Sequence, residues 1–268
     1  MDSTAPRGIA RRAPLAMDAE QFRALGHSLV DQIASLLESM PRGPVTRDES
    51  PADVRAALAL NGGLPAEGTD AEALLISTAR QLFAHSLFNG HPRFFGYVTS
   101  SPAPIGMLGD LLASAINPNV GAWKLSPAAS EIEGQAIRWM AELIGYPTDC
   151  GGILVSGGNM ANFVCFFAAR AARAGFDIRR EGVSASSHPL TVYASAETHT
   201  WIQKATDLAG LGTDSIRWIP TDSDLRMDVT QLERRIDADI AEGRVPLIVI
   251  ATAGSVSTGA VDPLRDIA

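Results

Sequence analysis

Three short apolar runs separated by helical patterns constrain the fold of this chain more than any other feature. The runs span residues 190–195, 216–219 and 245–251, and the last of them is almost wholly apolar. Helical patterns fill the two intervals, at residues 200–211 and from Asp228 onward. Apolar strands are buried between layers of helices, and an alternation of strands with helices is typical of parallel sheets. The sequence therefore predicts an α/β domain with a mostly parallel sheet and flanking helices.

The chain before this region shows helical patterns joined by extended segments. An amphipathic helix begins at Asp18, whose carboxylate can cap it, and a second helix follows at residues 70–88. Residues 41–69 between them are rich in Pro and Gly, which interrupt regular structure. A further helix begins at Ser126-Pro127, because Ser is a typical N-cap and Pro a typical first-turn residue.

These patterns divide the chain into three parts. We expect a disordered tail over residues 1–17, a helical and extended arm over 18–100, and an incomplete α/β domain over 101–268. The chain has 268 residues, of which 46% are hydrophobic, so it can bury one large core or two smaller ones.

The segment GGILVSGGNMANF, residues 151–163, suggests an anion site. Ile153–Val155 predicts a buried strand, Ser156–Asn159 a tight turn, and Met160–Arg173 a helix. The amides at a helix N-terminus carry partial positive charge, and a glycine lets the backbone approach an anion closely. This arrangement suits a single phosphate monoester, although glycine turns between a strand and a helix also occur without any ligand.

Neither common nucleotide motif accounts for this turn. A dinucleotide fingerprint needs GxGxxG, and here the two glycines are adjacent and the third is missing. A Walker loop needs a Gly-Lys pair, which occurs nowhere in the chain.

Two more polar segments follow predicted strands and are therefore expected at the same sheet edge. His199 comes shortly after the strand predicted at residues 190–195, and Thr252–Ser255 follows the strand predicted at residues 245–251. Ligands of parallel sheets bind at the carboxyl ends of the strands. An imidazole can stack on a flat heteroaromatic ring and donate a proton near pH 7, whereas a capping or partly buried histidine is the simpler interpretation of His199 alone.

Composition excludes several other classes of function. A net charge of −8 and a pI near 5.1, without a basic run, argue against a nucleic-acid partner. The two cysteines, Cys150 and Cys165, form no CxxC pair, and no Cys/His cluster has metal-ligand spacing, so no metal site is predicted. No stretch approaches the roughly 20 apolar residues of a membrane span, and the N-terminus lacks a secretory signal pattern. We expect a cytoplasmic protein with no membrane partner.

Taken in order, five stretches resemble the group II pyridoxal-phosphate-dependent decarboxylases, the family of the aromatic-amino-acid, histidine, glutamate and diaminobutyrate decarboxylases. The matching stretches are HPRFFGYVTSS (91–101), SPAASEIEGQAIRWMAELIGYP (126–147), GGILVSGGNMANF (151–163), SAETHTWIQKATDLAGLG (195–212) and TAGSVSTGAVDPL (252–264). The resemblance implies a fold-type-I large domain, here incomplete at its C-terminus, with an N-terminal helical arm. It also implies pyridoxal 5'-phosphate as cofactor and the decarboxylation of an L-amino acid to an amine.

The resemblance assigns cofactor roles to several positions. Gly157, Gly158 and Asn159 would hold the phosphate. His199 would stack on the pyridine ring and act as the catalytic histidine. Ser255 would also bind the cofactor, because it stands where the family has the first Thr of a Gly-Thr-Thr turn.

Other positions are less well defined by the resemblance. Val256 replaces the second Thr of that turn, so one hydroxyl is missing from it. Tyr97 and Thr99 would reach the substrate, and ordinary packing is an equal alternative for both. Val120 and Ala122 stand where aromatic-amino-acid decarboxylases tend to carry larger groups, which weakens an aromatic substrate without naming another.

The chain departs from the family in its lysines. It contains only Lys124 and Lys204. In the family, the Schiff-base lysine directly follows a His, and this pair lies downstream of the stretch that ends here at residue 264. Neither lysine of this chain therefore occupies that position. We therefore expect a fragment of a longer decarboxylase that is inactive alone. A natural truncation is the alternative.

Three functions remain open at this point. The first is an amino-acid decarboxylase, the second a related aldehyde-forming oxidative decarboxylase, and the third a non-catalytic relative or binding module. The N-terminal helix and its Pro/Gly arm resemble the dimer-clasping segment of the family, which implies a homodimer. A helix packed on its own subunit is the alternative.

Overall fold

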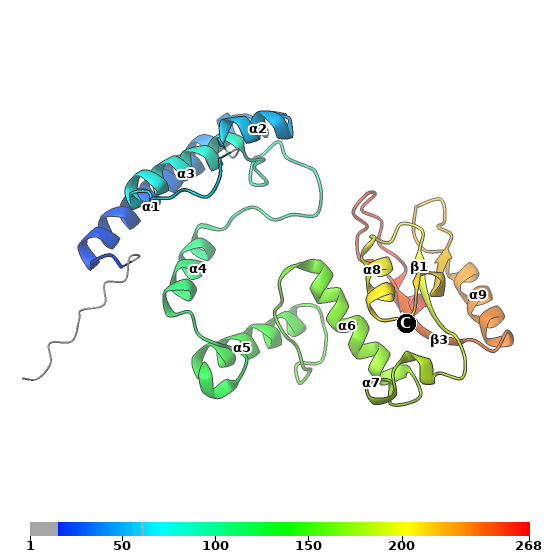
Figure 1. Cartoon of the computed structure of the whole chain (residues 1–268). Coiled ribbons are helices and arrows are strands. Elements are labelled where there is room, and N and C mark those ends of the chain that lie inside the picture. Colours follow the sequence, from blue (N-terminus) through cyan, green and yellow to red (C-terminus); the bar gives the residue numbers. More distant parts are fainter. Residues whose placement is uncertain (1–15, 60–61) are drawn as a thin grey trace, which may run out of the picture. The chain divides into compact units, whose positions relative to one another are not determined.

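The computed structural model describes residues 16–59 and 62–268 (Figure 1). We expected a disordered tail over residues 1–17, and residues 1–15 of it lie outside the described part of the chain. The chain divides into two compact units, of which the first ends at Gly109 and the second begins at Asp110. Each unit is described by itself.

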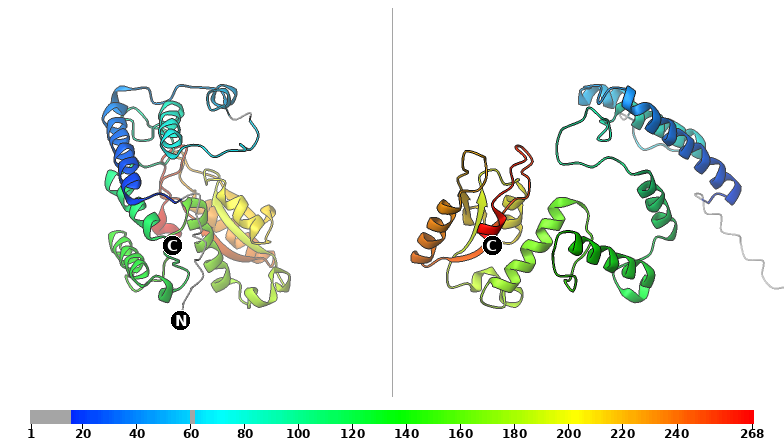
Figure 2. Two further views of the ribbon diagram at one scale, coloured as in Figure 1. Left: turned by 60° about the vertical axis from the view of Figure 1, so that its left-hand side comes forward. Right: turned by 180° about the vertical axis from the view of Figure 1, so that it is seen from behind.

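The first unit is built on a pair of long helices. Helix α1 spans Ala19–Ser39, α2 spans Pro51–Ala57, and α3 spans Ala71–His85. The Asp18 carboxylate accepts the Gln21 N–H at 2.8 Å, so the predicted cap of α1 is confirmed. Helices α1 and α3 pack side by side, as Figure 1 and both views of Figure 2 show.

Seven α-helices and three strands belong to the second unit, and from β1 onward strands and α-helices alternate as expected along the chain. The helices are α4 Pro104–Ile116, which crosses the boundary between the units, α5 Pro127–Leu143, α6 Gly157–Arg173, α7 Ile178–Glu181, α8 Trp201–Leu208, α9 Val229–Ala241 and α10 Leu264–Ile267. The strands are β1 Leu190–Ser195, β2 Ile216–Ile219 and β3 Val245–Ile250.

The described strands form one sheet in the order β2–β1–β3, and both pairings are parallel. Val192 in the central strand lies opposite Ile216 on one side and Ile248 on the other. The α/β fold with a parallel sheet is therefore confirmed. All six residues of β1 are buried, as a central strand between two helical layers requires.

Each face of the sheet carries its own helical layer. Val192 and Ala194 point toward α6 and α8 and join a core that contains Phe166, Trp201 and Ile202. The alternate residue of β1, Tyr193, points to the other face, where it packs with Leu232 of α9. Figure 1 shows α8 and α9 on opposite sides of the strands.

The strand predicted at Ile153–Val155 is wrong. Residues 151–155 have no regular structure, and Ile153 and Leu154 are 58% and 60% exposed. A strand exists only where a neighbour pairs with its backbone, and none of the three described strands lies beside this segment. The Leu154 N–H instead donates to the Glu133 carboxylate of α5 at 2.8 Å.

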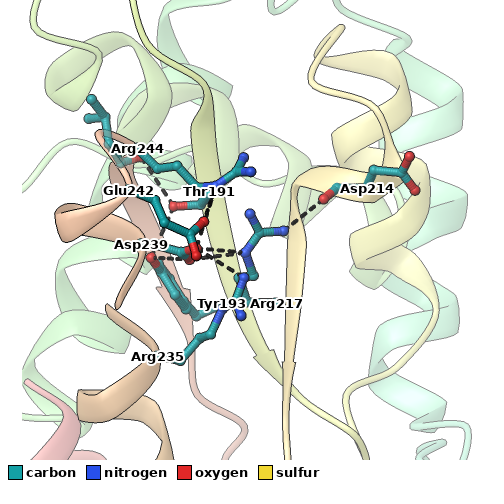
Figure 3. A network of polar contacts seen from close by, with 9 residues as sticks. Thr191, Tyr193, Asp214, Arg217, Arg235, Asp239, Glu242 and Arg244 are labelled. Carbon is teal, nitrogen blue, oxygen red and sulfur yellow. Dashed lines mark hydrogen bonds and ion pairs between the residues drawn. The ribbon is translucent and has the colours of Figure 1, made fainter. Parts of the chain in front are cut away.

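The buried carboxylate of Asp239 connects α9 to strands β1 and β2 (Figure 3). Asp239 is fully buried and accepts hydrogen bonds from Arg217 Nε at 2.9 Å, Arg235 Nη2 at 3.0 Å and the Tyr193 hydroxyl at 2.9 Å. Burial alone would raise the pKa of Asp239, but the hydrogen bonds from Arg217 and Tyr193 and the arginine charges hold that pKa below its usual value. Burial raises the pKa of Tyr193 to about 12, so its hydroxyl stays protonated and can donate.

Candidate cofactor site

The N-terminus of α6 is an open, uncapped helix end. The helix begins at Gly157, not at Met160 as predicted, so the two glycines form its first turn and not a separate turn. Among the described residues, no side-chain hydrogen bond from Ser156 caps this end. A Cβ added to Gly157 or Gly158 would meet no described atom within 4 Å. The first amides of α6 therefore face open space and can bind an anion.

Gly157 also has a conformational requirement. Its φ is +80°, a left-handed conformation that residues with a Cβ rarely adopt. Asn159, two residues later, is exposed on the first turn and offers a side-chain amide. The three predicted phosphate residues therefore lie together on one helix end.

His199 lies in a tight turn between β1 and α8. The turn is set by Ser195, whose hydroxyl accepts the Glu197 N–H at 3.0 Å and whose carbonyl accepts the Thr198 N–H at 2.9 Å. His199 Nδ1 then accepts the Trp201 N–H at 3.2 Å. In a neutral imidazole this assigns the proton to Nε2, and the ring is exposed, so Nε2–H is free to face a ligand.

Aromatic packing joins α6 to the start of α8. Phe163, one turn after Asn159, lies with its ring centroid 6.5 Å from that of Trp201, which is two residues after His199. The Phe166 ring packs edge-to-face on the same indole, with 6.4 Å between the ring centroids. Helices α6 and α8, which begin just after the predicted phosphate residues and just after His199 respectively, therefore pack against each other.

The loop after β3 carries Ser255 and is closed by a buried carboxylate. Asp262 accepts the N–H of Thr252 and the N–H of Met227, each at 2.7 Å. Ser255 is only 6% exposed, and its N–H donates to the Ala260 carbonyl at 2.9 Å. Because β3 and β1 are parallel neighbours, Ser255 and His199 both follow carboxyl ends at one edge of the sheet.

One buried polar atom at this edge lacks a partner. Thr198 is 8% exposed, and its Oγ1 makes no hydrogen bond within the part of the chain that the structure describes. A buried hydroxyl without a partner loses the hydrogen bonds it would make to water, so such an atom usually finds one. The Thr198 hydroxyl can therefore bind a polar group of a ligand at the carboxyl edge of the sheet.

The remaining predicted residues lie elsewhere in the chain. Tyr97 and Thr99 belong to the first unit and are exposed, and Tyr97 has a φ of +61°. Lys124 lies in the short 3-10 helix Trp123–Leu125 and Lys204 in α8, and both are exposed. Across residues 16–59 and 62–268, no three His, Cys, Asp or Glu side chains gather into a metal site, and no helix is long and apolar enough to span a membrane.

The family model of the pyridoxal-dependent decarboxylase conserved domain matches residues 54–268. The chain belongs to the pyridoxal-dependent decarboxylase family. The sequence resemblance to this family is therefore confirmed.

Individual relatives agree with the family match. An aromatic-L-amino-acid decarboxylase of Bacillus atrophaeus is 32% identical over 254 residues, which are 95% of this chain and 51% of the relative. A phenylacetaldehyde synthase of Petunia hybrida is 29% identical over 93% of this chain and 49% of its own length. The crystal structure of Oryza sativa TDC with PLP and tryptamine superposes with a TM-score of 0.83 at 30% identity, over 96% of this chain and 53% of that one. The chain spans about half the length of the relatives it matches.

Sequence reasoning missed three polar residues at this edge. Thr198 and Thr258 lie inside matched stretches but were not singled out, because a hydroxyl in a loop carries no spacing signal. Asp262 stands directly before Pro263, and nothing in the local sequence marks it as an acceptor for distant backbone amides. Only the three-dimensional contacts show that it closes the Ser255 loop.

Proposed function

We propose that the protein is a pyridoxal-phosphate-dependent carboxy-lyase that converts an L-amino acid to its amine. The observation that carries this proposal is the uncapped first turn of α6, a helix that packs through Phe163 on Trp201 of α8. Family membership supports the choice of pyridoxal phosphate as the anion. In this proposal the described residues contribute the phosphate side and one ring face of the cofactor site.

Each residue at the sheet edge has a distinct task in this proposal. When bound, pyridoxal phosphate supplies an electron sink for the cleavage of the carbon–carbon bond. The amides at the start of α6 and the Asn159 side chain bind the phosphate. His199 covers the ring and has its Nε2 proton available for transfer. The buried Ser255 hydroxyl would donate to an oxygen of the bound group.

We infer that neither lysine of these 268 residues is the cofactor lysine. Lys204 is exposed on α8, three residues after Trp201, and Lys124 is exposed in a 3-10 helix outside the described sheet. The chain taken alone is therefore expected to bind pyridoxal phosphate without forming a lysine adduct and without decarboxylase activity.

A second candidate reaction is the aldehyde-forming one. It is favoured by the likeness to a phenylacetaldehyde synthase, which is almost as similar as the decarboxylase of Bacillus atrophaeus. The substrate is an amino acid in either case, and the sequence-based expectation that Tyr97 and Thr99 reach it stays a prediction. Product analysis separates the two reactions. Both release carbon dioxide, but one gives an amine, whereas the other consumes dioxygen and water and gives an aldehyde, ammonia and hydrogen peroxide.

We further propose a cytoplasmic homodimer. Both cysteines are free, which suits a reducing compartment. Helix α4 exposes five large apolar side chains, which suit a subunit interface and are costly in water. They are Ile105, Leu108, Leu111, Leu112 and Ile116. Light scattering of the purified chain tests this, and a monomer at all concentrations would contradict it.

Titration of the 268-residue chain with pyridoxal phosphate tests the proposed site. We expect saturable quenching of tryptophan fluorescence that His199→Ala weakens about tenfold, because the ring would lose its stacking partner. His188→Ala is the matched control, since His188 is also exposed but precedes the amino end of β1. Equal binding by wild type and His199→Ala would refute the site.

The lysine inference is tested in the same samples. A lysine-bound cofactor absorbs in the visible at longer wavelength than the free aldehyde, and we expect no such band in the wild-type chain. A band that disappears in Lys124→Ala or Lys204→Ala would show that one of these lysines holds the cofactor.

A further inference from the structure

Two hydroxyl groups in the loop after β3 hydrogen-bond to each other, between Ser255 Oγ and Thr258 Oγ1. Each also accepts a backbone amide proton. The Thr258 N–H donates to Ser255 Oγ at 3.3 Å, and the Ala260 N–H donates to Thr258 Oγ1 at 3.2 Å. A further bond from the Gly259 N–H to the Ser255 carbonyl, at 2.9 Å, closes the turn.

Counting donors and acceptors limits what this pair can offer to a ligand. Each hydroxyl has one proton and two lone pairs, and one lone pair of each is filled by a backbone amide. When Thr258 donates to Ser255, both lone pairs of Ser255 are filled, and its own proton is free. Ser255 is then a hydrogen-bond donor only, which is the form that an anionic oxygen selects.

The two residues differ in exposure in a way that separates their tasks. Ser255 is buried at the carboxyl edge of the sheet, whereas Thr258 is exposed. Val256, which stands where the family motif has its second Thr, is 45% exposed and has no hydroxyl. Thr258, two positions later, supplies a second hydroxyl to the same turn.

We propose that Thr258 is a positioning residue that makes the Ser255 hydroxyl a donor toward an anionic oxygen of bound pyridoxal phosphate. This inference rests on the proposed function, and it adds a residue that contacts the ligand only through Ser255. The anionic oxygen belongs either to the phosphate or to the pyridine ring, and the two are distinguished by the ligand used as probe.

The test is a binding titration of the 268-residue chain with Thr258→Val, which keeps the shape of the side chain and removes its hydroxyl. We expect the dissociation constant for pyridoxal phosphate to rise about fivefold, the effect of one neutral hydrogen bond. Thr258→Ser restores the hydroxyl and should return the constant to the wild-type value. Inorganic phosphate serves as a second probe: weakened binding of both ligands assigns the oxygen to the phosphate, and weakened binding of pyridoxal phosphate alone assigns it to the ring.

A double-mutant cycle separates positioning from a general loosening of the loop. In a Ser255→Ala background, Thr258→Val should have no further effect, because there is no hydroxyl left to orient. Ser257→Ala is the matched control, since Ser257 is exposed in the same turn and is expected to bind like wild type.

Several outcomes would overturn the inference. The role of Thr258 is refuted if Thr258→Val weakens the binding of pyridoxal phosphate fivefold in the Ser255→Ala background, or if it does not weaken binding in the wild-type background. Either result leaves the proposed function in place. A wild-type chain that binds neither pyridoxal phosphate nor inorganic phosphate removes both.

Discussion

Replacing Asp239 by alanine tests whether one buried carboxylate holds the second unit together. Its side chain is fully buried on α9 and meets Arg217 of β2 and Tyr193 of β1, so it joins three elements (Figure 3). Truncation removes the carboxylate and leaves the Arg217 guanidinium, which is 12% exposed, without its ionic partner. We expect a large loss of stability with little change in the sheet edge that carries His199.

The magnitude follows from the exposure of each partner. Removing one member of a buried ion pair costs about 3–5 kcal/mol, and the Arg217 contact is of this kind. Arg235 and Arg244 are 42% and 34% exposed, so each contributes at most about 1 kcal/mol. Arg217 also donates to the Asp214 carbonyl at 2.9 Å, a bond that survives and favours the lower end of the range. The expected loss is about 3 kcal/mol, or a fall in Tm of roughly 6–12 °C for a unit of this size.

Urea unfolding followed by tryptophan fluorescence and circular dichroism measures this loss. Asp237→Ala is the matched control, because Asp237 lies two residues away on the same helix and is exposed. The control is expected within about 0.5 kcal/mol of wild type. A loss below about 1 kcal/mol for Asp239→Ala would show that the network does not carry the stability assigned to it.

The pH dependence provides an independent check. The folded pKa of Asp239 is lowered, so its contribution to stability is present above the unfolded pKa and is lost as the pH falls below about 4. Asp239→Asn keeps the shape of the side chain and removes this titration. Its stability should therefore change less than that of wild type between pH 5 and pH 3, and parallel curves would contradict the assignment.

Further substitutions test the loop closure and the helix end. Asp262→Ala leaves the N–H groups of Met227 and Thr252 without their acceptor and should cost about 2–3 kcal/mol in urea unfolding, whereas a cost under 0.5 kcal/mol would mean that water replaces the carboxylate. Gly157→Ala should destabilise the chain by about 1 kcal/mol in thermal unfolding, because its φ is +80°, and an unchanged Tm would show that the helix start relaxes. Gly158→Ala should raise Tm slightly, since the residue is helical with open space around it. The same change should weaken the binding of pyridoxal phosphate, because it places a methyl group over the anion. Unchanged binding would argue against the amides as the phosphate site.

The sheet could be predicted from the sequence because its strands are defined locally. Residues 190–195 and 216–219 form strands over the predicted bounds, and the third strand ends at Ile250, one residue earlier than expected. Short apolar runs bounded by polar turns indicate buried strands by themselves. Ile153–Val155 has the same local pattern without a pairing partner, and the pattern cannot report whether a neighbour exists.

The candidate site could be predicted only in part. Placing His199 and Ser255 after strand ends needed nothing more than the order of elements, and both lie there. Asp239 and Thr258 could not be found in this way. In the sequence Asp239 is one of several charged residues on a helix, and its burial is set by Arg217 and Tyr193, which come from two other elements.

The double use of the Asp262 carboxylate has a mechanical consequence. Its two oxygens bind the backbone at Met227, just before α9, and at Thr252, just after β3, so two segments 25 residues apart are fixed to the same group. A shift of the α9 start would therefore pull on the loop that holds Ser255. Sequence changes around residue 227, on the α9 face of the sheet, are therefore expected to move the Ser255 loop through the Asp262 carboxylate.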